Sequence, residues 1–173
     1  MDTTETVRAA RELLNHVTPL KGDCGRLCAR ACCRADEDGR GGMLLFPGEE
    51  ALYADAEDHG FRILPDDSVI PDGRLLICGG VCSREERPLA CRLFPLRPRA
   101  DGSIVADRRG WDVCPLARES LRALNPDFTD ACRQAAQMLC ACEEEKRFLH
   151  ALGVSIRRGL NETGLWEHGT GRE

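Results

Sequence analysis

Clustered cysteines are the feature that most restricts what this chain can fold into. Eleven of the 173 residues are cysteines, and eight of these fall into two sets of four. Thiolates are soft anionic ligands, so several of them close together favour a metal ion or an iron–sulfur cluster. The first set lies within ten residues, whereas the second is more widely spread. The sets are Cys24, Cys28, Cys32 and Cys33, and then Cys78, Cys82, Cys91 and Cys114.

The cysteines also bear on the cellular compartment. An odd total of eleven argues against a fully paired disulfide framework. The N-terminal stretch lacks the apolar run of a secretory signal, and no run of about 18 apolar residues suggests a membrane span. We therefore expect a cytoplasmic protein without a membrane segment. In that compartment disulfides are rare, and clustered cysteines favour metal or redox chemistry.

The charge is modest overall but unevenly distributed. A net charge of −5 gives no electrostatic reason to expect a nucleic-acid partner. Residues 35–72 hold eleven acids against two arginines, whereas residues 84–109 hold seven arginines against four acids. The basic strip can meet a protein partner or the negative charge of a thiolate cluster. The alternative is an ordinary solvated surface, which is the more common outcome for runs of charge.

Length and composition predict a single domain over residues 1–173. We expect it to be mainly α with short irregular strands, and to be a small, loop-rich cysteine-cluster domain stapled by metal. Residues 22–116 would form the metal-binding core, residues 117–160 the C-terminal helices and residues 161–173 a flexible tail. Aromatic residues make up only 5% of the chain, so a metal cross-link would strengthen a core poor in large side chains.

Apolar periodicity and turn residues predict the individual elements. Thr3 or Thr4 is a candidate cap for the first helix. The stretch 88–98 carries three prolines and is not expected to form a regular helix. The predicted helices cover residues 3–18, 47–59, 115–124 and 127–151, with a further one to Leu160. The predicted extended segments are 43–46, 61–64, 74–78 and 104–105.

Cysteine spacing indicates how the sulfurs would be presented. Three residues separate Cys24 from Cys28 and Cys28 from Cys32, so on a helix these thiols would share one face. If the segment is instead a loop, Gly25 would let backbone amides approach a metal closely. Cys78 and Cys82 repeat the spacing with two glycines between them. Cys91 and Cys114 would complete that quartet from a distance and so clamp the fold together.

Three motifs carry a family resemblance. They are the segment from Cys24 to Cys33, PGEE at residues 47–50 and EERPLACRLFPL at residues 85–96. Together they resemble the YkgJ-type cysteine-cluster proteins, a family described as zinc- or iron-chelating. The match spans roughly residues 22–116, about half of the chain, and RPLACRLFPL is its most specific part. The resemblance implies that the chelating set includes Cys24, Cys28, Cys32, Cys33, Cys78, Cys82 and Cys91.

Arg87 and Arg92 flank Cys91 within this motif. Pro88 and Pro95 would make the segment a rigid ligand holder by restricting its backbone. Four thiolates on one Zn²⁺ leave a net charge of about −2, which the two arginines would offset by contacting the bound cofactor. The alternative, that both arginines form salt bridges with surface acids, is equally compatible with the sequence.

The other candidate ligands are less persuasive. Cys132, Cys140 and Cys142 lie in the last long predicted helix, and we favour core packing for them. No histidine neighbours a cysteine pair, because His16, His59, His150 and His168 are isolated. All-sulfur ligation is therefore expected.

Cys₄ sites serve both structural zinc and iron–sulfur clusters. Abundant thiolates set among arginines and glycine N–H groups slightly favour iron–sulfur. The preferred function is a metal-binding module for redox reactions, electron transfer or metal handling that is not an enzyme by itself. One alternative is a structural zinc module for protein interaction. A second is a component of a protein lysine N-methylation system, because flagellin lysine N-methylases carry a similar cysteine motif.

Overall fold

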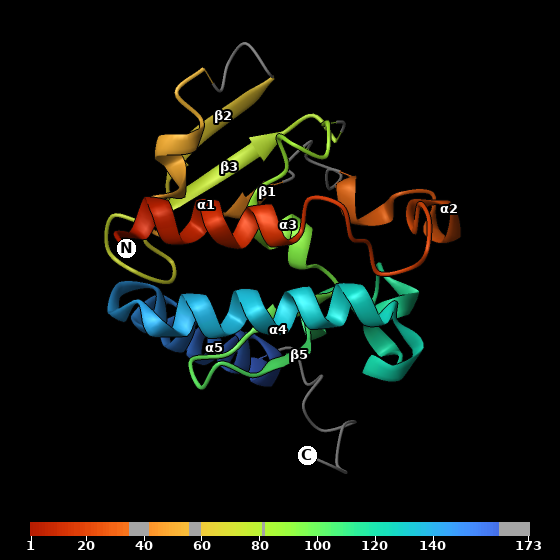
Figure 1. The fold of residues 1–173 in the computed structure, drawn as a ribbon. Helices are drawn as coiled ribbons and strands as arrows, with labels where there is room; N and C mark the ends of the chain where they lie inside the picture. The colour runs from red at the N-terminus through yellow and green to blue at the C-terminus, as the bar shows by residue number, and fades with distance from the viewer. Residues whose placement is uncertain (35–41, 56–59, 81, 163–173) are drawn as a thin grey trace.

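Helices and small antiparallel sheets share the chain, with about 48% of the structure helical and 13% in strands. The computed structural model describes residues 1–34, 42–55, 60–80 and 82–162 (Figure 1). The prediction of a domain in which helix predominates over short strands is confirmed at this level. The predicted flexible tail lies, from residue 163 on, outside the described residues.

Helix α1, Thr3–Leu13, packs along helix α4, Pro126–Ala141. Each helix buries the apolar stripe that its sequence predicts. Complete burial of a valine, leucine or phenylalanine side chain contributes about 1.5–3 kcal/mol. The two helices therefore form the centre of the main core (Figure 1). The fully buried residues of the two stripes are Val7, Ala10, Leu14, Phe128, Cys132, Ala135 and Leu139.

The ends of α1 differ from the sequence prediction. Asp2, rather than Thr3 or Thr4, caps the helix by accepting a hydrogen bond from the backbone of Glu5. The Glu5 carboxylate accepts from the Asp2 backbone in return, which completes a capping box. Thr4 is engaged elsewhere, since its hydroxyl donates to the carbonyl of Gly48. The helix also ends at Leu13, earlier than the predicted end at residue 18.

The long helix predicted over residues 127–151 is in fact two helices. Helix α4 ends at Ala141 and helix α5 spans Glu143–Glu162, with Cys142 between them in an extended conformation. Three glutamates in the first turn of α5 favour a new start there, because carboxylates stabilise helix N-termini. The break lets α5 take its own packing partner, and Phe148 meets Phe46 edge-on at a centroid distance of 5.1 Å.

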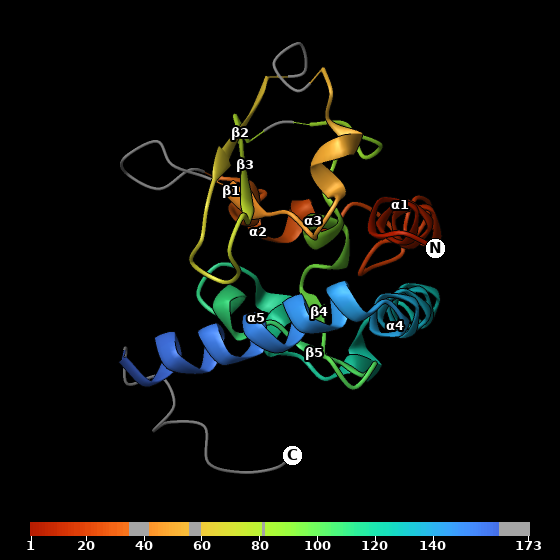
Figure 2. The same cartoon turned by 90° about the vertical axis from the view of Figure 1, so that its left-hand side faces the viewer.

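The extended segments form two small antiparallel sheets, as Figures 1 and 2 show. In both views the three-stranded sheet lies above α4 and α5, and in Figure 1 α1 runs between them. The two-stranded sheet lies with α4, which it contacts. The first sheet has the order β1–β3–β2, and its strands are β1 (Gly42–Leu44), β2 (Phe61–Pro65) and β3 (Arg74–Cys78). The second pairs β4 (Leu96–Pro98) with β5 (Ile104–Ala106).

Several predicted helices are reduced to single turns. The helix expected over residues 47–59 is a 3₁₀ turn, η2 (Glu49–Leu52), preceded by Gly48 at a left-handed φ of 75°. Residues 56–59 of that prediction lie outside the described residues. The helix expected over residues 115–124 is likewise two turns, because an extended stretch interrupts it. These turns are η5 (Pro115–Arg118) and η6 (Leu121–Ala123), and a further turn, η4, covers Arg108–Gly110.

The proline-rich stretch 88–98 does contain a short helix, α3 (Leu89–Leu93), so the expectation that it excludes one is wrong for these residues. Pro88 occupies the cap position with an extended backbone. Its missing N–H costs nothing there, because the first N–H groups of a helix lack partners within the helix.

The apolar side chains form two separate cores. The main core lies among α1, α3, α4 and α5. The small core contains Leu45, Tyr53, Phe61 and Leu76 and packs on the three-stranded sheet. None of the described helices combines the length and apolar composition that crossing a membrane requires.

Glu145 is an anomaly in the main core. Its side chain is fully buried, and within the described part of the chain neither carboxyl oxygen has a hydrogen-bond partner. Burial, reinforced by the nearby Cys142 and Glu49, raises the pKa of Glu145 to about 9. The folded protein therefore holds a proton here that the unfolded chain releases above its ordinary pKa near 4.5.

Replacing Glu145 by glutamine should flatten the pH dependence of stability. In the wild type, this carboxyl lowers the free energy of unfolding progressively between pH 4.5 and about 9, by at most about 1.4 kcal/mol per pH unit. Urea titrations from pH 5 to pH 8 would measure the difference. The exposed neighbour provides a matched control, Glu144→Gln, and equal pH slopes in all three proteins would contradict the assignment.

Candidate metal centre

The segment that carries the first cysteines is a helical turn followed by a reversal. Helix α2 spans Gly25–Cys28, with Cys24 at its N-terminal end. Ala29 and Arg30 then adopt left-handed φ angles of 47° and 57°, which are uncommon for residues with a Cβ. The chain continues into η1, Ala31–Cys33. The structure thus decides between the two geometries that the spacing allowed, because no continuous helix presents Cys24, Cys28 and Cys32 on one face.

The second cysteine-bearing loop presses against the first. Cys78 is the last residue of β3 and pairs with Phe61 of β2, so the sheet fixes its position. Gly80 follows at a φ of 80°, and a Cβ at this position would come within 2.6 Å of the carbonyl oxygen of Cys33. Glycine is therefore required by both conformation and space, and the chain lies against η1 at Gly80.

Cys91 lies in α3, and a buried carboxylate fixes that helix. Glu49 Oε1 accepts the backbone N–H of Leu89, the first residue of α3, at 2.7 Å. Its Oε2 accepts the N–H of Phe46 at 3.1 Å, and Arg11 of α1 lies 3.8 Å from Oε1. Burial raises the pKa of Glu49, and these donors partly offset that effect. Glu49 thus positions the helix that carries Cys91.

The sulfurs of the first group lie near one another and near Cys114. The Sγ atoms of Cys32 and Cys33 are 3.9 Å apart. Burial raises the pKa of Cys24, and the thiols of Cys114 and Cys28 add to that effect. The interaction with Cys33, together with Cys28 and Cys24, raises the pKa of Cys32. Cys114 is buried in the main core, against which Cys24 also packs.

The pKa values of the remaining thiols depend in part on Cys33. Burial raises the pKa of Cys91, and Cys33, Cys82 and Cys78 raise it further. Burial likewise raises the pKa of Cys82, with contributions from Cys78 and Cys33. The thiols of the predicted set thus influence one another's pKa values although they come from distant parts of the sequence, and Cys32 and Cys33 are the pair in direct contact. Within the described residues, no three Cys, His, Asp or Glu side chains are already arranged to hold a metal ion.

The two predicted cofactor-contacting arginines have different surroundings. Burial lowers the pKa of the Arg87 guanidinium, but the thiols of Cys82, Cys33 and Cys91 raise it overall. Its Nε is buried and, among the described residues, has no hydrogen-bond partner. Arg92 instead donates to the carbonyl oxygens of Arg87, Arg11 and Glu85 and to the side chain of Asn15. Arg92 therefore joins α3 to α1, and these contacts account for most of its donors.

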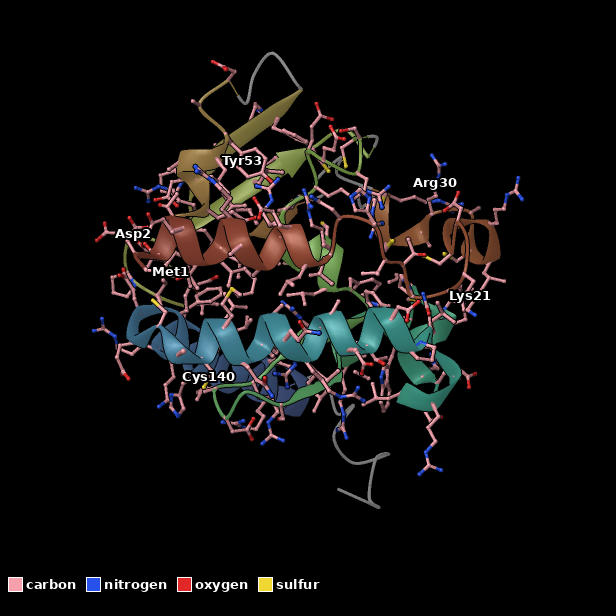
Figure 3. All side chains as sticks on the ribbon, in the orientation of Figure 1. Met1, Asp2, Lys21, Arg30, Tyr53 and Cys140 are labelled. Atoms are coloured by element: carbon pink, nitrogen blue, oxygen red, sulfur yellow. The ribbon has the colours of Figure 1, made fainter. Side chains whose placement is uncertain are left out.

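The third group of cysteines, Cys132, Cys140 and Cys142, occupies three different environments. Cys132 is fully buried in the main core, as predicted. Cys140 donates from its Sγ to the carbonyl oxygen of Ala100 at 2.9 Å, and Cys142 occupies the break between α4 and α5. Figure 3 places Cys140 towards the opposite end of the molecule from Arg30, which belongs to the reversal after α2.

Two supporting residues were not singled out from the sequence. Glu49 was noted only as part of the PGEE motif, and its long-range partners leave no trace in local sequence. Arg84 holds the end of α1 and the segment leading to Cys24, since its guanidinium donates to the carbonyl oxygens of Leu14, Asn15 and Val17. The concentration of arginines in residues 84–109 was the available signal, but it did not distinguish internal contacts from a solvated surface.

Comparison of the chain with protein-family models, with curated proteins and with solved structures gives no significant match. The resemblance to YkgJ-type proteins therefore stays a prediction based on the motifs.

Cys33 should be the most reactive thiol of the metal-free, reduced protein. The thiol of Cys32, opposed by burial and aided by Arg87, lowers the pKa of Cys33 to about 6. Iodoacetamide at pH 7 should therefore label Cys33 first in peptide mass spectrometry. The variant Cys32→Ala should slow that labelling by roughly tenfold, because the thiolate fraction falls. Equal labelling of Cys33 and Cys28 in the wild type would contradict this.

Replacing Glu49 by glutamine should destabilise the fold, since its carboxylate accepts two buried N–H groups. We expect the free energy of unfolding to fall by about 1.5–3 kcal/mol, the usual contribution of a hydrogen bond to a charged group. Urea denaturation monitored by circular dichroism would measure it. The exposed neighbour supplies the control Glu50→Gln, which should change stability by less than about 0.5 kcal/mol. Identical midpoints for both variants would refute a positioning role.

Proposed function

We propose that this protein binds metal through its clustered cysteines and serves as a redox, electron-transfer or metal-handling module. The observation that carries the proposal is the convergence of cysteines that are distant in the sequence. Gly80 of the second loop lies against the Cys33 carbonyl oxygen of the first, and the Cys33 thiol raises the pKa of Cys91 in α3 and of Cys82. Thiols gathered from separate segments at one place are the usual arrangement of a cysteine-ligated metal site.

The electrostatics of the thiols fit such a centre. Most of the thiols for which a shift is resolved have raised pKa values, partly because each neighbouring thiolate opposes a further negative charge. A bound cation would lower these thiol pKa values, since coordination deprotonates thiols and releases their protons. The protein-only arrangement therefore concentrates ligands whose negative charge a metal would balance.

The geometry and the surrounding charge are also suitable. Tetrahedral zinc with Zn–S bonds of about 2.3 Å places its sulfurs roughly 3.8 Å apart. The Sγ atoms of Cys32 and Cys33 are 3.9 Å apart. Arg87 lies against the sulfurs and has a buried, unpartnered Nε within the described residues, so it can donate to a sulfur-rich anion.

Two kinds of centre suit this all-sulfur donor set. A bound zinc ion would supply a cross-link, whereas an iron–sulfur cluster would supply one-electron chemistry. The contribution of the chain is the same in both cases: α3, the sheet and the reversal after α2 hold the thiols, and Arg87 balances their charge.

A structural zinc module that binds another protein is the second candidate. It is favoured by the exposure of Leu27, at 59%, among the exposed arginines of the α2 region. Figure 3 shows Lys21 and Arg30 pointing outward at this end of the molecule. The positive charge of these arginines would complement an acidic protein surface.

The variant Cys91→Ala should lose metal and thermal stability together, because Cys91 joins α3 to the two cysteine loops. Anaerobic expression followed by elemental analysis would measure the metal, and a thermal melt would measure stability. An absorbance shoulder near about 400 nm would identify iron–sulfur, and colourless protein containing zinc would identify the alternative.

The matched control is Cys142→Ala, which removes a partly buried thiol at the break between α4 and α5. It should leave the metal content unchanged. Full metal content and an unchanged melting temperature in Cys91→Ala would refute the role of Cys91. A stoichiometric loss of metal in Cys142→Ala would place the third cysteine group in the site.

A further inference from the structure

We infer that Cys32 and Cys33 form a redox pair, which closes to a disulfide by exchange with a small-molecule disulfide. The supporting observation is the direct contact of the two sulfurs, whose Sγ atoms are 3.9 Å apart. The inference goes beyond metal binding and does not depend on it, because the two thiols react with each other and no metal takes part.

Adjacency in the sequence does not by itself bring two sulfurs into contact. Neighbouring side chains diverge by about 100° around an α-helix and by about 120° around a 3₁₀ turn. Cys32 and Cys33 lie in such a turn, η1. Their contact therefore arises because both side chains turn towards each other.

Hydrogen bonds hold the backbone around the pair. The N–H of Cys33 donates to the carbonyl oxygen of Arg30 at 2.8 Å, and the N–H of Arg34 donates to that of Ala31 at 3.2 Å. The Arg34 guanidinium also donates to the carbonyl oxygen of Ala29 at 3.2 Å. Two thiols held side by side in this way lose little conformational freedom when they react, which favours closure.

Solvent can reach the pair. Cys32 is exposed and Cys33 is half-buried, whereas Cys114 and Cys132 are buried. An accessible thiol next to a second thiol is typical of reversibly oxidised cysteines, because the second thiol displaces the group that the first one acquires.

The reaction consists of two thiol–disulfide exchanges. In the first, one cysteine sulfur attacks a small-molecule disulfide, RSSR, so that a mixed disulfide forms and one RSH leaves. In the second, the other cysteine sulfur attacks the protein sulfur of the mixed disulfide, the Cys32–Cys33 bond forms and a second RSH leaves. The pair thus loses two electrons and two protons, which the oxidant takes up as two thiols. The sulfurs move from 3.9 Å to about 2.05 Å apart.

This disulfide should be easy to reduce again. Successive Cα atoms are about 3.8 Å apart across a trans peptide, whereas disulfides usually join Cα atoms about 4.4–6.8 Å apart. A disulfide between adjacent residues is therefore strained, and strained disulfides are the labile and regulatory ones. If the proposed metal-binding function holds, closure would also withdraw two of the predicted ligands.

Peptide mass spectrometry can test the pair, because trypsin cleaves after Arg30 and Arg34 and releases both cysteines in fragment 31–34. Full-length protein would be reduced and then incubated with oxidised glutathione, both as purified and after treatment with a chelator. Iodoacetamide would block the remaining thiols. Fragment 31–34 should lack alkyl groups and be lighter than its reduced form by about two hydrogens, and dithiothreitol should restore both alkylation sites. Absence of this product from both preparations would overturn the inference.

Two comparisons test whether the contact, and not mere closeness in sequence, drives closure. Fragment 134–146 is the matched control, since it carries Cys140 and Cys142 with one residue between them. Cys140 donates to the carbonyl oxygen of Ala100 at 2.9 Å, so this pair should close roughly tenfold more slowly. Urea that unfolds the chain should also slow closure of fragment 31–34 by roughly tenfold. Equal rates in either comparison would contradict a preformed pair.

Single variants test the second exchange. In Cys32→Ala and in Cys33→Ala the first exchange still occurs, but the neighbouring thiol that would complete the second is missing. Fragment 31–34 should therefore accumulate bound glutathione in both variants and not in the wild type. Stable glutathione on the wild-type fragment, or a disulfide joining it to fragment 27–30 through Cys28, would overturn the inference. Failure of the metal-binding proposal would leave these readouts unchanged.

Discussion

The buried carboxylate of Glu49 connects helix α1, the segment before η2 and helix α3. It accepts N–H groups from the segment before η2 and from the start of α3, and it lies beside Arg11 of α1. Arg92 of α3 reinforces the connection by donating to the end of α1. Because α1 packs on α4 and α3 carries Cys91, this polar cluster fixes the sulfur-bearing loops relative to the helical core.

The same construction explains how a chain with few aromatic residues maintains two cores. The α1–α4 interface supplies the large apolar surface, and the three-stranded sheet adds a small core of its own. Cysteines lie at the edge of each core, so the proposed metal centre would occupy the place where the cores approach one another. Metal binding would then be coupled to the relative position of the two cores, so that each stabilises the other.

Local sequence predicted the stripes of α1 and α4 and the strands β1, β2, β3 and β5, because burial periodicity and turn residues are local properties. It did not predict β4, Leu96–Pro98, in the proline-rich stretch. It also did not predict the break at Cys142, although three glutamates open α5, because the apolar pattern runs on from α4 towards Phe148, which packs against Phe46. Cysteine spacing predicted a converging set of thiols, of which the structure shows the Sγ atoms of Cys32 and Cys33 3.9 Å apart and, among the described residues, no group of three ligands. The position of Cys114 inside the main core, against which the half-buried Cys24 packs, depends on tertiary packing, which spacing does not encode. Arg92 was expected at the cofactor, and only the tertiary structure shows that α1 supplies its acceptors.

The left-handed pair Ala29 and Arg30 has a consequence for affinity. This conformation costs a residue with a Cβ roughly 1–2 kcal/mol of conformational free energy. Two such residues follow one another between Cys28 and Cys32. If coordination holds this reversal in place, part of the intrinsic binding free energy is used to maintain it. Every 1.4 kcal/mol used in this way weakens the measured dissociation constant by about tenfold. The backbone at these two positions would therefore set how readily the protein releases its metal, which is the property that separates a carrier from a permanent structural site.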